Sequence, residues 1–266
     1  MTAGALLFGR YAYPPNALGY CGPGDPAGLL EQAARRDTPT GTPASPAQAV
    51  ATRELAERAR SFEGAWPYLQ LIAGANHITD PLDRRVVEAY WIGNPLLDHV
   101  GPELLAASVE TRFRPRAGNT WGRLAEVLPA GGRPHHSFHV FAIYPWIGLL
   151  RAGHVDEPLR VLDQCRVRWG RVEAVEGDLA VVRSRPLLWD GSRLGYGPAR
   201  PETATLASGG RGFVTQLLPG QWVSLHWGWI CDRLSEHQRR MLAHYSALSL
   251  AAVNRTAHPA PAAVLS

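Results

Sequence analysis

The sequence contains no lysine, and all 27 of its basic residues are arginine. Together with abundant alanine, glycine and proline, this most simply indicates a GC-rich genome. The arginines are interleaved with 23 acidic residues, and the net charge of +4 is modest for a chain of 266 residues. Nucleic-acid binding is therefore not favoured, because it usually needs a concentrated basic surface.

Cysteines are few, and long apolar runs are missing. The three cysteines form no even disulfide framework. The first nine residues lack the basic n-region of a signal peptide, and no apolar run approaches the roughly 18 residues of a membrane span. We therefore expect a reducing, cytoplasmic protein without a membrane partner. Phosphate-binding loops, dinucleotide fingerprints and serine-hydrolase elbows are also absent from the sequence, so it indicates none of those enzyme classes.

The periodicity of apolar residues changes near Cys165. Before it, the spacing favours helices: residues 82–92 carry a helical apolar stripe, and residues 134–151 predict a central helix kinked at Pro145. Residues 3–24 are rich in turn formers and predict little regular structure. After Cys165, residues 167–175 and 179–185 read as two strands of a hairpin.

These patterns predict an α+β protein with two domains. Residues 1–158 would form a helical domain of unknown function, with a linker at residues 153–158. Residues 159–254 would form a small β-barrel with a C-terminal helix, and residues 255–266 a flexible tail. A one-residue slip of the strand pattern near Gly170 predicts a bulge or barrel corner there.

Two segments of the second half carry a resemblance to a known family. Cys165, Gly170 and Val172 fit the pattern C-x-x-x-P-G-x-V, although Trp169 stands where the pattern has proline. A later strand fits G-x-W/Y-V-x-V-H-x-G-F through Gly220, Trp222, Val223, His226 and Gly228. On these residues, the C-terminal third resembles hydrogenase-maturation chaperones of the HypC/HupF type. The front half resembles an uncharacterised bacterial family encoded near hydrogenase genes.

The resemblance implies a HypC-like, OB-like barrel and an accessory role in maturation of a nickel-iron hydrogenase, without catalysis by the chain itself. It implies that Cys165 and His226, with Gly170 and Gly228 beside them, bind iron or a partner. The iron would be a transient Fe(CN)2CO fragment. The partner would be a HypD-type protein or the hydrogenase large-subunit precursor. Family members expose this cysteine at the processed N-terminus, whereas Cys165 is internal.

Each of these residues also has a simpler interpretation. A thiolate suits low-valent iron, and Arg166 and Arg168 beside Cys165 would favour its ionised form. Otherwise Cys165 is a buried, inert cysteine. His226 is otherwise a surface histidine on a half-buried strand.

A second candidate site lies in the front half, at His135, His136 and His139. In a helix His135 and His139 share one face and can reach one metal, whereas His136 is rotated by about 100°. Metal or haem ligation here would make the chain an enzyme of the same pathway. Histidines at a helix start are otherwise caps or core residues. A third hypothesis is a binding module whose barrel arginines hold RNA or another anion.

Overall fold

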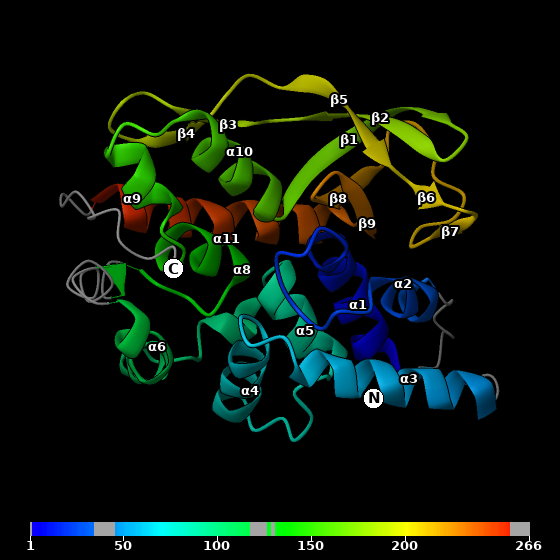
Figure 1. Ribbon diagram of the computed structural model, residues 1–266, viewed down its shortest axis with the longest axis horizontal. Helices are drawn as coiled ribbons and strands as arrows, with labels where there is room; N and C mark the ends of the chain where they lie inside the picture. The colour runs from blue at the N-terminus through cyan, green and yellow to red at the C-terminus, as the bar shows by residue number, and fades with distance from the viewer. Residues whose placement is uncertain (1, 35–45, 118–126, 129–130, 256–266) are drawn as a thin grey trace.

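The computed structural model describes residues 2–34, 46–117, 127–128 and 131–255. It has an α+β fold in which helices precede a five-stranded sheet and a long helix ends the chain (Figure 1). The expected tail at 255–266 lies outside the described residues, apart from Arg255 at the end of the last helix. Among the described helices, none combines the length and the apolar character needed to cross a membrane.

The helical half is built around its first helix, α1 (Thr2–Ala17). The expectation of little regular structure at residues 3–24 holds for residues 18–24 but was wrong for residues 3–17, where residues 4–16 are buried and make the helix the centre of the core. Its small residues let other elements approach closely: a Cβ at Gly4 would meet the carbonyl of Leu82, and one at Gly9 would meet Ala33. Tertiary burial has overridden the turn signals of its prolines.

The remaining helices of this half surround α1 or follow it. They are α2 (Pro26–Ala33), α3 (Pro46–Arg60), α4 (Trp66–Ala75), α5 (Arg84–Trp91), the 3-10 turn η1 (Pro95–Leu97), α6 (Pro102–Ala117), α8 (His136–Phe138), the π-helical η3 (His139–Ile143), α9 (Trp146–Arg151) and α10 (Asp156–Cys165). The single kinked helix predicted at 134–151 is therefore three short elements. Tyr144 is extended because a residue before proline disfavours the helical region, and α9 restarts after Pro145.

Five strands pair in a ring, in the order β1, β2, β5, β9, β8 and back to β1. They are β1 (Arg168–Glu176), β2 (Leu179–Ser184), β5 (Arg200–Thr205), β8 (Trp222–His226) and β9 (Trp229–Leu234). The contact between β5 and β9 is parallel and rests on the pair Thr205 and Trp229, whereas the other contacts are antiparallel. Small two-stranded additions are β3 (Leu187–Trp189) with β4 (Leu194–Tyr196), and β6 (Ala207–Ser208) with β7 (Arg211–Gly212).

The sequence placed two features of the strands slightly wrongly. The bulge of β1 lies between Val172 and Ala174, not at Gly170. The strand that carries the second motif ends at His226, before the motif's Gly228, because Trp227 and Gly228 both take positive φ and form a tight turn into β9. The predicted hairpin around Gly177 is confirmed by the antiparallel pairing of β1 with β2.

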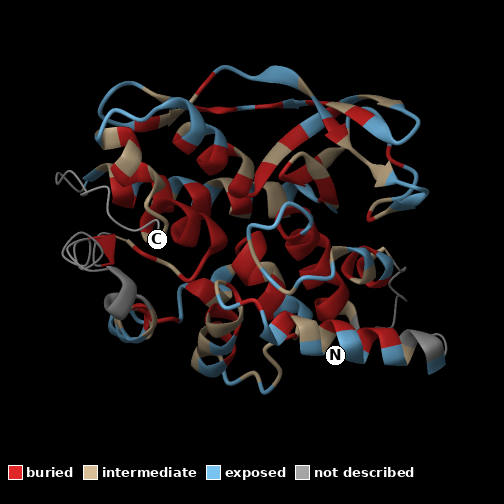
Figure 2. Ribbon diagram, viewed as in Figure 1, coloured by how far each residue is buried: buried red, intermediate tan, exposed pale blue. Residues whose placement is uncertain are grey.

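The junction between the halves is a helix rather than a linker. The predicted linker at 153–158 is wrong in its second part, because Asp156 to Pro158 form the first turn of α10. The last helix, α11 (Glu236–Arg255), packs against α8 as well as β1 and β9. Figure 2 shows buried residues on both sides of the boundary, and one apolar cluster runs from Ala5 to Val253. The halves thus share a core.

Expression of residues 159–266 alone tests the two-domain division. Because β8 makes its buried polar contacts with α1, we expect this fragment to expose apolar surface and to lose cooperative unfolding. Circular dichroism during denaturant unfolding, with the full chain as control, measures this. A soluble fragment with one cooperative transition would instead establish the two-domain division.

Candidate functional site

The structure brings together three potential ligands that are far apart in the sequence. Atoms of His136, Cys165 and His226 that can bind a metal all lie within 4.8 Å of one another, and all three residues are buried. No other group of three or more such residues meets this criterion within the described ranges. Cys165 and His226 are the two residues that the resemblance singled out, and His136 comes from the helical half.

Cys165 is placed by the way α10 ends. The last carbonyl groups of a helix need partners from outside it. Here the backbone N–H of Trp227 donates to the Gln164 carbonyl at 2.9 Å, and His136 Nε2 lies 2.8 Å from the Cys165 carbonyl. The β8–β9 turn and α8 therefore both converge on the end of α10, with the thiol between them.

His226 ends β8 and is completely buried, so the interpretation as a surface histidine is wrong. Its Nδ1 lies 2.7 Å from the carbonyl oxygen of Tyr11. A carbonyl only accepts, so Nδ1 carries the proton and Nε2 of the neutral ring keeps a lone pair. Nε2 makes no hydrogen bond to any described residue. The ring is thus in the tautomer that a metal-binding Nε2 requires.

His136 begins α8 and is held at both ring nitrogens. Nε2 lies against the Cys165 carbonyl, to which it donates, and Nδ1 lies 3.2 Å from the hydroxyl of Tyr90. That hydroxyl also lies 3.3 Å from the Gly64 carbonyl and can donate to it. With Nε2 donating to the carbonyl, Nδ1 keeps a lone pair and accepts from the Tyr90 hydroxyl, and that hydroxyl could accept from Nδ1 only once Nε2 leaves the carbonyl.

Aromatic rings enclose the cluster. The ring centroid of Trp91 lies 4.6 Å from that of His136 and 5.6 Å from that of His226. On Tyr11 the Trp91 ring stacks at a centroid distance of 5.3 Å. Tyr20, from the segment between α1 and α2, stacks on Trp227 at 4.2 Å. Tyr20 is 44% exposed and Trp227 only 7%, so the buried Trp227 ring packs beneath a solvent-exposed one.

Burial keeps all three side chains neutral. It raises the pKa of the Cys165 thiol well above its usual range, with the Cys21 thiol adding to the rise and the Trp227 indole opposing it. Burial lowers the pKa of His136 to about 4 and lowers that of His226 strongly, where charge on His136 adds to the effect. A thiolate, formed when the metal displaces the thiol proton, and two neutral imidazoles are ligands that suit a soft or borderline metal ion.

The expected activation of Cys165 by its neighbouring arginines does not occur, because both arginines are buried and paired. Asp163 accepts from Arg166 at 2.9 Å and lies 3.5 Å from Arg168, whose guanidinium also contacts Glu202 at 3.0 Å and donates to Gln164 at 3.2 Å. Asp163 also accepts from the backbone N–H of Leu187 at 2.9 Å. This network fixes the α10–β1 junction rather than the charge of the thiol.

Replacement of Asp163 by asparagine should strongly destabilise the protein. The side chains of Arg166 and Arg168 are only 1% and 3% exposed, so their guanidinium groups would lose a charged partner without reaching water. We expect a loss of about 3 to 5 kcal/mol of unfolding free energy. Denaturant unfolding measures it, and Glu157→Gln, which breaks the exposed pair with Arg160, is the control with a much smaller change.

Gly170 and Gly228 shape the barrel and supply no ligand atom. A Cβ at Gly170 would lie 2.4 Å from Cγ1 of Val182, so only glycine permits this approach of β1 and β2. Gly228 has a φ of 76° and completes the turn after His226. Both glycines fit the motif because Gly170 permits the close approach of two strands and Gly228 permits the positive φ of the turn.

The structure does not bring His135 and His139 together. His135 caps α8, with Nδ1 accepting from the backbone N–H of Ser137 at 3.2 Å, and its ring lies against Tyr245. His139 Nδ1 lies 3.3 Å from the Tyr68 hydroxyl. The helix starts only at His136, so the assumed shared face does not exist. Helical spacing had favoured His135 and His139 over His136 as metal ligands. No local pattern in the sequence signals the contact between His136 and Cys165.

The other two cysteines have different surroundings. Cys231 lies at the bulge of β9, is fully buried, and its thiol is 3.7 Å from the Trp229 carbonyl. Burial raises the pKa of the Cys21 thiol to about 12. Neither belongs to the cluster of three described above.

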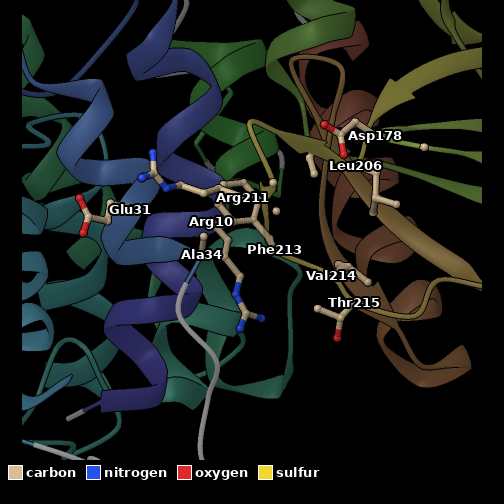
Figure 3. Close-up of a pocket in the computed structure, with 13 residues that line it drawn as sticks. Arg10, Glu31, Ala34, Asp178, Leu206, Arg211, Phe213, Val214 and Thr215 are labelled. Atoms are coloured by element: carbon tan, nitrogen blue, oxygen red, sulfur yellow. The ribbon is translucent and has the colours of Figure 1, made fainter. Parts of the chain in front are cut away.

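A cleft of about 730 Å³ opens elsewhere, between the helical half and the barrel (Figure 3). Arg10 and Glu31 reach it from α1 and α2, and Asp178 and Arg211 from loops and short strands of the second half. The lining carries both charges. None of the predicted site residues is among the described residues that line it.

Fold and site together define an α+β protein with a buried thiol–imidazole cluster between its halves. The chain belongs to DUF6390, a family of unknown function, whose model matches residues 1–260. The match covers both halves as one unit. No curated protein and no solved structure matches the chain.

Proposed function

We propose that this chain is an accessory protein in nickel-iron hydrogenase maturation, and that its cargo is an iron fragment of the type Fe(CN)2CO held at Cys165 and His226. The observation that carries the proposal is their proximity. The two residues belong to separate motifs about sixty residues apart, and they meet in one buried cluster. A thiolate and an imidazole are ligands that low-valent iron accepts.

The strand order supports the HypC-like part of the proposal. Counting the five ring strands from the N-terminus, the order is 1-2-3-5-4 with a parallel contact between the third and the fifth. This is the arrangement of a five-stranded OB-like Greek-key barrel. The function would be docking and delivery, with a HypD-type protein or the large-subunit precursor as partner.

The alternative of a metal- or haem-dependent enzyme at the histidines of the front half has less support. His135 and His139 have separate partners, and His136 faces the barrel residues instead. The hypothesis of an RNA-binding barrel is weakened because Arg166 and Arg168 are buried in ion pairs.

Anaerobic purification from a hydrogenase-producing strain, followed by infrared spectroscopy, tests the proposal. We expect CO and cyanide stretching bands in the purified protein, and their loss in Cys165→Ala. Cys231→Ala removes a buried thiol outside the cluster, and this control variant should keep the bands. Purified protein without these bands and without a co-purifying maturation partner would contradict the proposed function.

A further inference from the structure

We propose that His136, Cys165 and His226 together form a three-ligand site for a divalent transition metal, to which α8, the end of α10 and the end of β8 each bring one ligand. This inference rests on the proposed function in one respect, since it names the full ligand set of the same site. It goes beyond the resemblance, because His136 lies outside both motifs.

The donor set determines the class of metal. One thiolate and two imidazoles suit Zn²⁺, Fe²⁺ or Co²⁺, whereas Mg²⁺ and Ca²⁺ prefer oxygen ligands, which this cluster lacks among the described residues. Three protein ligands also leave a coordination position open. A six-coordinate iron bound by the same three residues would keep three positions, which matches the two cyanides and one CO of the proposed fragment.

The geometry requires only a small closure. Ligand atoms bound to one tetrahedral metal lie roughly 3.3 to 3.8 Å apart, given bonds of about 2.0 to 2.3 Å. Those of the cluster already lie within 4.8 Å. Metal binding through Nε2 of His136 would also replace its contact with the Cys165 carbonyl, 2.8 Å away.

The hydrogen bonds around the two histidines fit metal ligation. The Tyr11 carbonyl fixes the proton of His226 on Nδ1 and leaves its buried Nε2 without a partner among the described residues. His136 can release its Nε2 proton when Nδ1 donates to the Tyr90 hydroxyl, which in turn donates to Gly64. Such outer contacts orient the ligands of protein metal sites.

Titration of the full chain with Co²⁺ in the absence of oxygen tests the site. We expect one equivalent to produce a thiolate-to-cobalt charge-transfer band, and Cys165→Ser to abolish it. His226→Asn and His136→Gln keep a donor toward the carbonyls of Tyr11 and Cys165 but lose the ligand. Loss of a hydrogen bond that only orients a metal ligand already lowers metal affinity about 10–100-fold. Each of these two variants loses the ligand itself, so each should weaken Co²⁺ binding about 100-fold or more.

Matched controls are Cys231→Ser and His139→Gln, which alter a buried thiol and a buried histidine outside the cluster and should keep the wild-type affinity. Should His136→Gln fail to fold, Tyr90→Phe gives a second measurement, with affinity expected to fall about 10–100-fold. Unchanged Co²⁺ affinity in His136→Gln, or no thiolate band in the wild type, would overturn the inference. Infrared bands of CO and cyanide in that same wild type would still support the proposed function, so the two failures are distinguishable.

Discussion

Hydrogenase maturation is expected to fail when Cys165 is replaced by alanine, although the protein still folds. The substitution removes one sulfur atom from a tight site and should cost roughly 1 to 2 kcal/mol of stability, far less than a large core deletion. It also removes the only thiolate that the described cluster offers to iron. Hydrogenase activity and partner pull-down, in a strain lacking the native gene, measure the effect.

Cys231→Ala is the matched control, because Cys231 is as deeply buried and lies in the strand beside His226. Its loss of packing should be similar and its effect on maturation small. Full hydrogenase activity with Cys165→Ala would mean that the barrel serves as a docking surface without ligand chemistry.

Mild acid should unfold the protein, because four buried histidines are neutral in the native state. Burial lowers the pKa of His135 to about 3 and that of His136 to about 4, and it lowers the pKa values of His139 and His226 strongly. In the unfolded chain the same rings titrate near 6.5. Between about pH 6.5 and 4 the unfolded state therefore binds more protons, and stability falls as the pH falls.

The expected slope is large. Each proton that only the unfolded state binds contributes about 1.4 kcal/mol per pH unit, so four histidines give up to about 5.5 kcal/mol per pH unit. A typical domain has only about 5 to 15 kcal/mol in total. Denaturant unfolding at several pH values from 7 to 4.5 measures the slope.

His136→Gln should reduce this slope by about one proton, or about 1.4 kcal/mol per pH unit. A substitution of His154, which is exposed, controls for the loss of a histidine in general. A stability that stays constant from pH 7 to pH 5 would contradict the burial of these rings.

The sequence determined the local elements whose signals lie within a few residues. Alternation and Gly177 predicted the β1–β2 hairpin, and the change of periodicity near Cys165 matches the end of α10, although the domain boundary predicted after residue 158 falls inside that helix. The apolar stripe at residues 82–92 predicted a helix, found as α5 (Arg84–Trp91). The two motifs selected Cys165 and His226 before any contact between them was known.

Tertiary structure alone decided what surrounds those residues. Turn formers in α1 became a central helix because burial on all sides outweighs local propensity. Arg166 and Arg168, which by sequence would activate Cys165, point instead into an ion-pair network. His136 lies in the cluster because the carbonyl at the end of α10 accepts from its ring, while α8 starts two residues later than the helix predicted from residue 134. Such contacts depend on how chain segments 29 and 90 residues away pack, and no periodicity within a single element records that.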